Sequence, residues 1–250
     1  MAQQNIKQII KQEYIKCAKD PVYFMKKYCW IQHPTRGRVQ FNLYPFQEGA
    51  LNLLQKNDRN IILKSRQLGI STLSAGISLW MMVFQKDKSI LVVATKQDTA
   101  KNLVTKVKFM YDNLPSWLQI GFTENNKLAL RLKNGSQVKA VSAASDAGRS
   151  EAISLLIIDE AAFIEENRIE EIWGSSQQTL STGGRAIVLS TPNGTGNFFH
   201  RMWTKAEDGS NGFVPIRLPW TVHPERNQEW RDKQDDELGL RMAAQECDCD

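Results

Sequence analysis

The feature that most limits the possible folds is the order of strand, glycine-bearing turn and helix between residues 60 and 84. Residues 60–63 form the short apolar run that is typical of a buried parallel strand. Backbone N–H groups and the dipole at the start of the following helix favour an anion. After Gly69, apolar residues recur at close to helical spacing, at Leu73, Ile77, Leu79, Trp80 and Val83. The segment therefore predicts an α/β fold with a phosphate site.

The turn at residues 64–72 is close to a phosphate-binding loop, but its lysine has moved. The usual Walker A pattern is G-x-x-x-x-G-K-[ST]. Aligning Gly69 with the second glycine puts Ser71 on the hydroxyl position, Ile70 on the lysine and Lys64 on the first glycine. A loop that wraps a phosphate brings its first and penultimate positions to the same ligand, so Lys64 can supply the charge that Ile70 lacks. The alternative is an ordinary strand, turn and helix without a ligand.

Further buried strands are predicted along the chain, and helical patterns separate them. Strands that alternate with helices indicate a mostly parallel central sheet with helices on both faces. The Asn134-Gly135 pair indicates a hairpin between strands at 128–132 and 137–141. Residues 1–30 carry a helical apolar stripe, and a turn-rich connector follows at 33–38. The other expected elements are strands at 89–94, 155–159, 186–190 and 213–216, and helices at 45–54 and 99–114.

The size and composition of the chain exclude several classes of protein. With 250 residues, the chain can form one large core or two modest domains. No apolar run approaches the roughly 20 residues that span a bilayer, so we expect no membrane partner. The first seven residues contain no apolar signal core, which favours an intracellular protein. The four cysteines are too few and too scattered for a disulfide framework, and the net charge of +5 permits contact with nucleic acid.

A pair of acidic residues, Asp159-Glu160, directly follows the apolar strand at 155–158. In phosphate-loop enzymes an acidic residue at this position helps to hold Mg²⁺ together with the loop hydroxyl, here Ser71. The adjacent carboxylate is placed to orient and deprotonate an attacking water. We therefore predict Asp159 as the magnesium residue and Glu160 as the general base. The alternative is a strand that ends in two solvated acids.

Polar residues also follow the strand at 186–190. Ser190 and Thr191 place hydroxyls at the edge of the sheet where doubly wound folds bind their ligands. Such a strand end can sense the γ-phosphate and relay its loss to neighbouring elements. Read alone, Pro192-Asn193-Gly194 indicates only a turn.

Four segments together resemble the large terminase subunit of tailed bacteriophages, the ATPase that packages viral DNA. They are residues 43–47, 64–71, 156–164 and 189–194, and residues 197–203 continue the resemblance. The resemblance implies a P-loop NTPase of the RecA-like or ASCE type with a helical N-terminal subdomain. It divides the chain into a helical subdomain or lid at 1–42, an ATPase core at 43–212 and a C-terminal lid or linker at 213–250.

The resemblance also implies roles for single residues. It supports Lys64 as the phosphate lysine, although other family members keep a lysine where Ile70 stands. Gln47 resembles the adenine-recognising glutamine, since an amide can pair with the donor and acceptor of adenine together. The nucleotide-binding residues implied are Tyr44, Gln47, Lys64, Ser65, Arg66, Gln67, Leu68, Gly69, Ile70, Ser71 and Thr72.

Two arginines are candidates for stabilising the transferred phosphoryl group. Arg66 lies within the loop and is expected to act in its own subunit, whereas Arg149 is expected to reach a neighbouring subunit. Either residue can also be an ordinary surface arginine. Lys101, Lys106 and Lys108 form a candidate DNA-binding helix face, although a solvated face explains them equally simply.

The family resemblance implies ATP and Mg²⁺ as ligands. It also implies double-stranded DNA bound without sequence preference, a portal protein, a small terminase subunit and a homo-oligomeric ring in the host cell cytoplasm. The family's second half is a ribonuclease-H-type nuclease, but this chain supplies no such carboxylate cluster, so we expect no nuclease activity from it. Two alternatives remain open: a superfamily 2 helicase, and a nucleotide-gated binding module that has lost catalysis.

Overall fold

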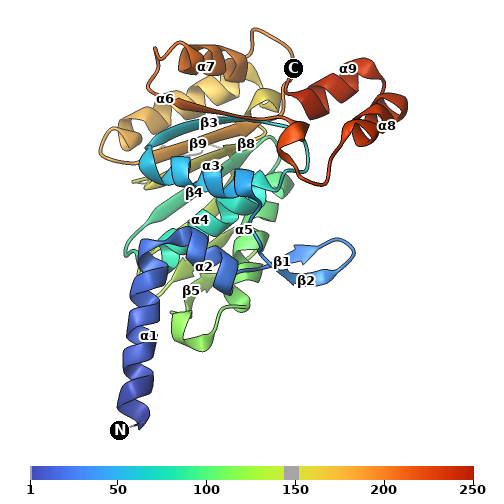
Figure 1. Ribbon diagram of the computed structural model, residues 1–250. Coiled ribbons are helices and arrows are strands. Elements are labelled where there is room, and N and C mark those ends of the chain that lie inside the picture. The colour runs from blue at the N-terminus through green and yellow to red at the C-terminus, as the bar shows by residue number, and fades with distance from the viewer. Residues whose placement is uncertain (1, 144–151) are drawn as a thin grey trace.

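The computed structural model describes residues 2–143 and 152–250 and is built around an eight-stranded sheet (Figure 1). The strand order is β10-β3-β9-β8-β4-β7-β6-β5. The pairs from β10 to β7 are parallel, and β6 and β5 continue the sheet antiparallel. The strands are β3 (Arg59–Lys64), β4 (Ser89–Ala94), β5 (Phe122–Asn125), β6 (Ala129–Leu132), β7 (Gln137–Ser142), β8 (Leu155–Asp159), β9 (Arg185–Ser190) and β10 (Val214–Leu218).

The strand order confirms the predicted sheet and its type. β9 lies between the strand that leads into residues 64–72 and the strand that ends at Asp159. This inserted strand is the arrangement expected of an ASCE phosphate-loop fold. Sequence patterns missed β5, a four-residue strand whose side chains are mostly exposed and therefore carry no apolar signal.

Helices cover both faces of the sheet, because the buried strand side chains alternate between two apolar cores. Ile62 faces the core formed with α3 (Pro45–Lys56), α4 (Ile70–Phe84) and α5 (Gln97–Asp112). Ile61 faces the opposite core, formed with α6 (Glu166–Leu180) and α7 (Phe198–Glu207). Because the central strands are parallel, their carboxyl ends lie along one edge of the sheet, and the loops that follow them meet there.

The N-terminal region is two helices and a hairpin. α1 (Ala2–Lys19) and α2 (Pro21–Tyr28) are separate because Asp20 caps α2 through the N–H of Tyr23 and Pro21 opens it. The predicted connector at 33–38 is the turn between β1 (Trp30–His33) and β2 (Gly37–Gln40). In Figure 1, α1 and this hairpin both project from the body of the molecule.

The C-terminal region returns to the strand ends after β10. It contains α8 (Gln228–Leu238), α9 (Leu240–Ala243) and a π-helical turn (Ala244–Asp248), and it lies beside the edge of the sheet in Figure 1. The described residues also form short 3₁₀ turns at Ser116–Leu118, Ala161–Phe163 and Trp220–Val222. None of the helices in the described part of the chain is long and apolar enough to cross a membrane.

Candidate nucleotide-binding site

The carboxyl ends of three neighbouring strands bring the predicted site residues to one edge of the sheet. Leu63 pairs with Ser190, and Asp159 pairs with Leu189, so Lys64, Asp159 and Ser190 end adjacent strands. Lys64 is also paired with Leu218 of β10. The parallel registers therefore place the phosphate loop, the acidic pair and the polar strand end side by side.

The phosphate loop is held in a tight turn before α4. Gly69 caps the helix in the left-handed conformation with a φ of 72°, and Gln67 also has a positive φ of 60°. Ile70, at the usual lysine position, is 1% exposed and brings no charge to the loop. The Lys64 Nζ lies 3.0 Å from Glu160 Oε1, and the Lys64 side chain is only 7% exposed. The one buried cation of this loop therefore comes from the end of β3.

The acidic pair differs in burial and in partners. Asp159 is 5% exposed, and burial raises its pKa; the Glu160 carboxylate adds to this rise, whereas Lys64, a hydrogen bond from Ser71 and Lys106 oppose it. The Glu160 backbone N–H donates to Asp159 Oδ1 at 3.0 Å. Glu160 itself has a φ of 54°, a conformation that costs energy in a residue with a side chain. The turn therefore directs two adjacent carboxylates to different surroundings.

Gln47 connects the start of α3 with the phosphate loop. Its Oε1 accepts from the Tyr44 backbone N–H at 3.0 Å, and its Nε2 donates to the Leu68 carbonyl at 2.9 Å. A Cβ added at Gly69 would lie 2.7 Å from Gln47 Nε2, so the side chain and the loop are in close contact. The amide that was predicted to recognise adenine therefore also holds the loop.

A cavity of about 470 Å³ opens beside this glutamine. Tyr44, Gln47, Gly69, Thr72 and residues of the β1–β2 hairpin line it, and His223 and Glu225 close it from the C-terminal region. The Tyr44 ring lies 5.7 Å from the Phe46 ring in a stacked arrangement and 4.6 Å from the His223 ring. A cavity lined by flat aromatic rings and an amide has the chemistry to hold a purine base.

The polar end of β9 contacts the segment that follows Glu160. Ser190 Oγ accepts from the Ala162 backbone N–H at 3.1 Å, and Asn193 Nδ2 donates to the Ala162 carbonyl at 3.0 Å. Thr191 is 3% exposed beside them. These contacts link the predicted coupling residues to a backbone position two residues from the predicted general base.

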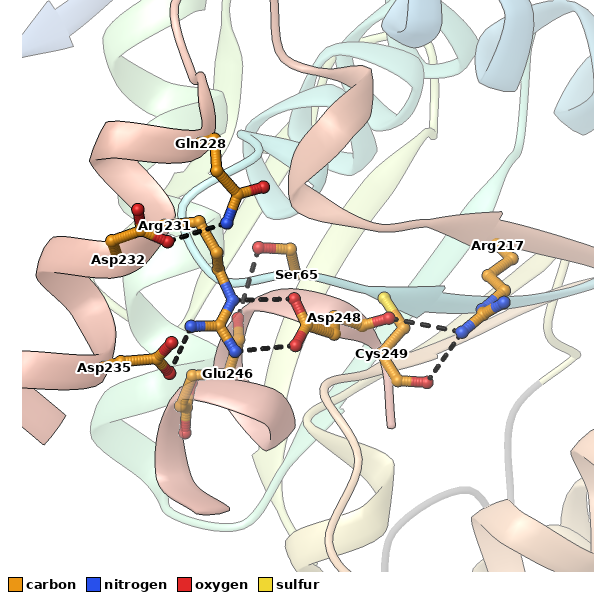
Figure 2. Close-up of polar contacts among 9 residues, drawn as sticks. All are labelled: Ser65, Arg217, Gln228, Arg231, Asp232, Asp235, Glu246, Asp248 and Cys249. Atoms are coloured by element: carbon orange, nitrogen blue, oxygen red, sulfur yellow. Dashed lines mark hydrogen bonds and ion pairs between the residues drawn. The ribbon is translucent and has the colours of Figure 1, made fainter. Parts of the chain in front are cut away.

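The C-terminal region completes the phosphate loop with hydrogen bonds that sequence patterns did not indicate (Figure 2). The Glu246 carbonyl accepts from the Arg66 backbone N–H at 2.7 Å and from Ser65 Oγ at 3.2 Å. The Ser65 backbone N–H donates to the Leu218 carbonyl at 2.7 Å. These pairings join residues that lie far apart in the sequence, and no motif marks Glu246 as a partner of the loop.

Arg231 holds this C-terminal turn in place. Its Nε and Nη2 donate to the two Asp248 carboxylate oxygens at 2.9 and 2.7 Å, and its Nη1 contacts Asp235 (Figure 2). Two carboxylates beside one guanidinium raise its pKa above the ordinary arginine value. The guanidinium therefore connects α8 to the turn that contacts the phosphate loop.

Of the two predicted phosphoryl-stabilising arginines, only Arg66 lies within the described residues. The Arg66 side chain is 70% exposed, with Nη1 3.3 Å from Glu246 Oε2. Arg149 lies outside the described residues. Arg226, which sequence patterns did not single out, donates to Ser65 Oγ at 3.1 Å and to the Arg66 carbonyl at 3.0 Å. Arg226 thus contacts the phosphate loop, whereas the Arg66 side chain contacts the C-terminal turn.

The structure separates the three lysines of α5 that were grouped as one solvated face. Lys101 and Lys108 pair with Asp98 at 3.6 Å and Asp112 at 2.6 Å on their own helix. Lys106 is half-buried and lines a second cavity together with Thr72 of the phosphate loop. Lys106 is therefore not simply a solvated lysine, because it lines a cavity with a residue of the loop, and DNA contact by this helix stays a prediction.

Solved large terminases share this fold. The Thermus phage P74-26 large terminase ATPase domain matches with a TM-score of 0.68 at 20% identity, over 83% of this chain and 93% of that domain. The HK97 bacteriophage large terminase matches with a TM-score of 0.74 at 17% identity, over 93% of this chain and 54% of that one. A large terminase from a thermophilic bacteriophage, solved in complex with ADP, matches with a TM-score of 0.66 at 11% identity, over 82% and 52%. The chain thus spans about half the length of the HK97 and thermophilic-phage proteins.

The family of N-terminal regions of T4-like-virus-type large terminase subunits matches residues 61–244. This range begins in β3, before the phosphate loop, and ends at the C-terminal turn that contacts the loop. It therefore contains the strand ends described above and covers well over half of the chain. The protein belongs to the family of phage large terminase subunits and carries their N-terminal region.

Proposed function

We propose that this chain hydrolyses ATP as the motor region of a terminase that drives double-stranded DNA into a viral procapsid. The family membership supports the packaging role and does not favour the helicase alternative. The observation that carries the ATPase assignment is the contact between Lys64 and Glu160 at the edge where Asp159 also ends its strand. The thermophilic-phage terminase was solved in complex with ADP, which supports a nucleotide as the ligand proposed here.

Asp159 and Ser71 are the residues that would hold Mg²⁺. Their donor set fits this ion, because a buried carboxylate hydrogen-bonded to a loop hydroxyl offers the hard oxygen ligands that magnesium prefers. The ion would neutralise charge on the nucleotide phosphates. The raised pKa of Asp159 reflects the cost of burying this charge, and a cation beside the carboxylate would lower that cost.

Lys64 and Glu160 would exchange partners when nucleotide binds. In the structure, the ammonium and the carboxylate neutralise one another at 3.0 Å. Phosphate oxygens compete for Lys64, and Glu160 is then free to accept a proton from an attacking water. Arg66 from the same subunit and Arg149 from a neighbour are the proposed cations for the transferred phosphoryl group.

Ser190 and Thr191 would relay hydrolysis to the rest of the motor. The Ser190 contact with Ala162 gives the end of β9 a direct connection to the segment that carries Glu160. The proposed partners are double-stranded DNA, contacted through its phosphates, a portal protein, a small terminase subunit and further copies of this chain in a ring. The host cell cytoplasm is the proposed location.

ATP turnover tests the assignment. With Mg²⁺, double-stranded DNA and the proposed partners present, we expect Lys64→Ala and Glu160→Ala each to lose about 100-fold or more of the rate, since one removes the phosphate cation and the other the base. Ile70→Lys in the Lys64→Ala background should restore part of it, as a lysine then returns to the usual loop position. Lys205→Ala, at an exposed lysine of α7, is the control. Full turnover by Lys64→Ala would refute the displaced lysine.

Nucleotide binding separates the ATPase from the binding-module alternative. Glu160→Ala should still bind ATPγS, because the base is not needed for affinity. A wild-type protein that binds ATP but releases no phosphate with DNA and partners present would be a nucleotide-gated binding module.

A further inference from the structure

Lys106 is a half-buried cation to which the reaction described above gives no role. It lies on α5, whose other lysines at 101 and 108 pair with carboxylates on the same helix. Lys106 makes no ion pair within 4.0 Å among the residues that the structure describes. Its ammonium is therefore available for a ligand, whereas those of its neighbours on the helix are engaged.

The surroundings of Lys106 lead to the phosphate loop. A cavity of about 430 Å³ is lined by Lys106 and Asn102 of α5, by Thr72 of the loop and by the β1–β2 hairpin. The cavity beside Gln47 is lined by the same Thr72 and by the same hairpin residues Ile31, Gln32 and Pro34. The two cavities thus adjoin along these shared residues, and Lys106 lines the one next to the base cavity.

Lys106 also interacts electrostatically with charged residues of the nucleotide site. Burial lowers the pKa of its ammonium; attraction to Asp159 opposes this shift, and repulsion from Lys64 adds to it. Both partners end neighbouring strands at the edge where the phosphates are proposed to bind. Lys106 is therefore within electrostatic range of the proposed metal residue and of the proposed phosphate lysine.

The phosphate loop supplies little positive charge of its own to offset the charge of a bound nucleotide. A nucleoside triphosphate brings about four negative charges, and helix N-termini and cations offset them at phosphate sites. Ile70 contributes none, and Lys64 shares its charge with Glu160. A lysine on a flexible stem supplies a compact charge that can reach a phosphate from a neighbouring helix.

We propose that Lys106 is a second phosphate-binding cation of this site and contacts the polyphosphate chain of the bound nucleotide together with Lys64. The inference rests on the proposed function, since it assumes a nucleotide in the loop. Lys106 would thereby replace, from α5, the charge that Ile70 removes from the loop. The competing role is that of a counter-charge that only balances Asp159.

Equilibrium binding of ATPγS and ADP to the full chain tests this inference. We expect Lys106→Met to weaken ATPγS binding by about tenfold or more, because a charged hydrogen bond to phosphate is lost while the apolar stem is kept. Lys106→Arg should retain most of the affinity. Lys101→Met, which removes a lysine of the same helix that pairs with Asp98 and does not line this cavity, should leave the affinity unchanged.

Two further measurements keep the test decisive. In EDTA, Lys106→Met should weaken ATPγS binding equally in the wild-type and Asp159→Asn backgrounds if Lys106 contacts phosphate, and a loss that disappears with Asp159→Asn would overturn the proposal in favour of the Asp159 counter-charge. Binding of adenosine, which has no phosphates, should be equal in wild type and Lys106→Met. Equal ATPγS affinity in these two folded proteins, checked by circular dichroism, would also overturn the proposal. Absence of ATPγS binding by wild type would refute the proposed function itself.

Discussion

Gly69 stands at the point of the phosphate loop where a side chain would meet Gln47. Its φ of 72° is costly for any residue with a Cβ, and an added Cβ would lie 2.7 Å from Gln47 Nε2. Gly194, after the end of β9, has nearly the same φ of 71° but no heavy atom within 4 Å of an added Cβ. Both glycines thus adopt a positive φ that is costly for other residues, but only at Gly69 would a side chain also collide with a neighbour.

We expect Gly194→Ala to lower the free energy of unfolding by about 1 kcal/mol through backbone strain alone. Gly69→Ala should lower it further, because the new methyl group displaces the Gln47 amide from the Leu68 carbonyl. Urea denaturation of both variants measures the difference. Gln47→Ala in the Gly69→Ala background should recover part of the extra loss, and equal losses for the two single variants would contradict the steric contact.

Local motifs revealed part of the site at the residue scale. The positions of Lys64, Asp159 and Ser190 followed from where each apolar run ends, since parallel strands bring their carboxyl ends to one edge. Lys106 and Glu246 were missed because their relation to the loop depends on how α5 and the C-terminal turn pack. The sequence does not indicate which of several lysines on one helix is directed toward the phosphate loop.

At the scale of elements, the buried strands were predictable and the C-terminal helices were not. β8 and β9 contain unbroken apolar runs at residues 155–158 and 186–189, so their sequences contain the signal of burial on both faces. α8 is mostly polar, and its attachment depends on Arg231 with its two carboxylate partners. The position of α8 thus depends on one ion cluster between residues distant in the sequence, and the apolar periodicity of a sequence does not indicate such a cluster.

We expect Arg231→Met to loosen the C-terminal turn from the phosphate loop. The change leaves Asp235 and Asp248 facing each other without a cation, at a cost of about 2 kcal/mol, reduced from the value for a fully buried pair because both carboxylates are partly exposed. Hydrogen exchange of the Arg66 amide, which donates to the Glu246 carbonyl, reports the loosening directly. Lys233→Met, whose ion pair with Glu237 is exposed on the same helix, is the control. Unchanged exchange at Arg66 would show that Arg231 does not hold the turn.

At the scale of the whole molecule, the predicted subdivision at residues 42 and 212 stays a prediction, but the structure shows how the parts are joined. β10 is hydrogen-bonded to β3 in the central sheet, so the C-terminal part is joined to the core by a strand. α1 is joined to the body through polar contacts: Glu13 Oε1 accepts from Lys27 at 2.7 Å, from Tyr23 at 2.5 Å and from Tyr28 at 2.8 Å. The hydrogen bond from Lys27, with help from the tyrosines, lowers the pKa of Glu13 from 4.5 to about 2.

This carboxylate should make the attachment of α1 depend on pH. A lowered pKa means that the stabilisation is complete above pH 4.5 and is lost as the pH falls toward about 2. Glu13→Gln should speed hydrogen exchange along α1 roughly twofold to fivefold at pH 7, the range of a partly exposed ion pair. The difference from wild type should shrink as the pH falls from 4.5 toward 2, where about half of wild-type Glu13 is protonated as well. Glu207→Gln, an exposed position at the end of α7, should exchange as wild type at both pH values.

The pairing of Ser65 and Arg66 with Glu246 has a consequence for synthesis of the protein. The hydroxyl of Ser65 meets its acceptor 181 residues later in the chain. During translation, β3 and the start of α4 emerge long before residues 244–249, so the loop lacks these acceptors until those residues have left the ribosome. The hydrogen bonding of the phosphate loop is thus completed only after about 180 further residues have been made, although its own strand and helix are formed from neighbouring residues.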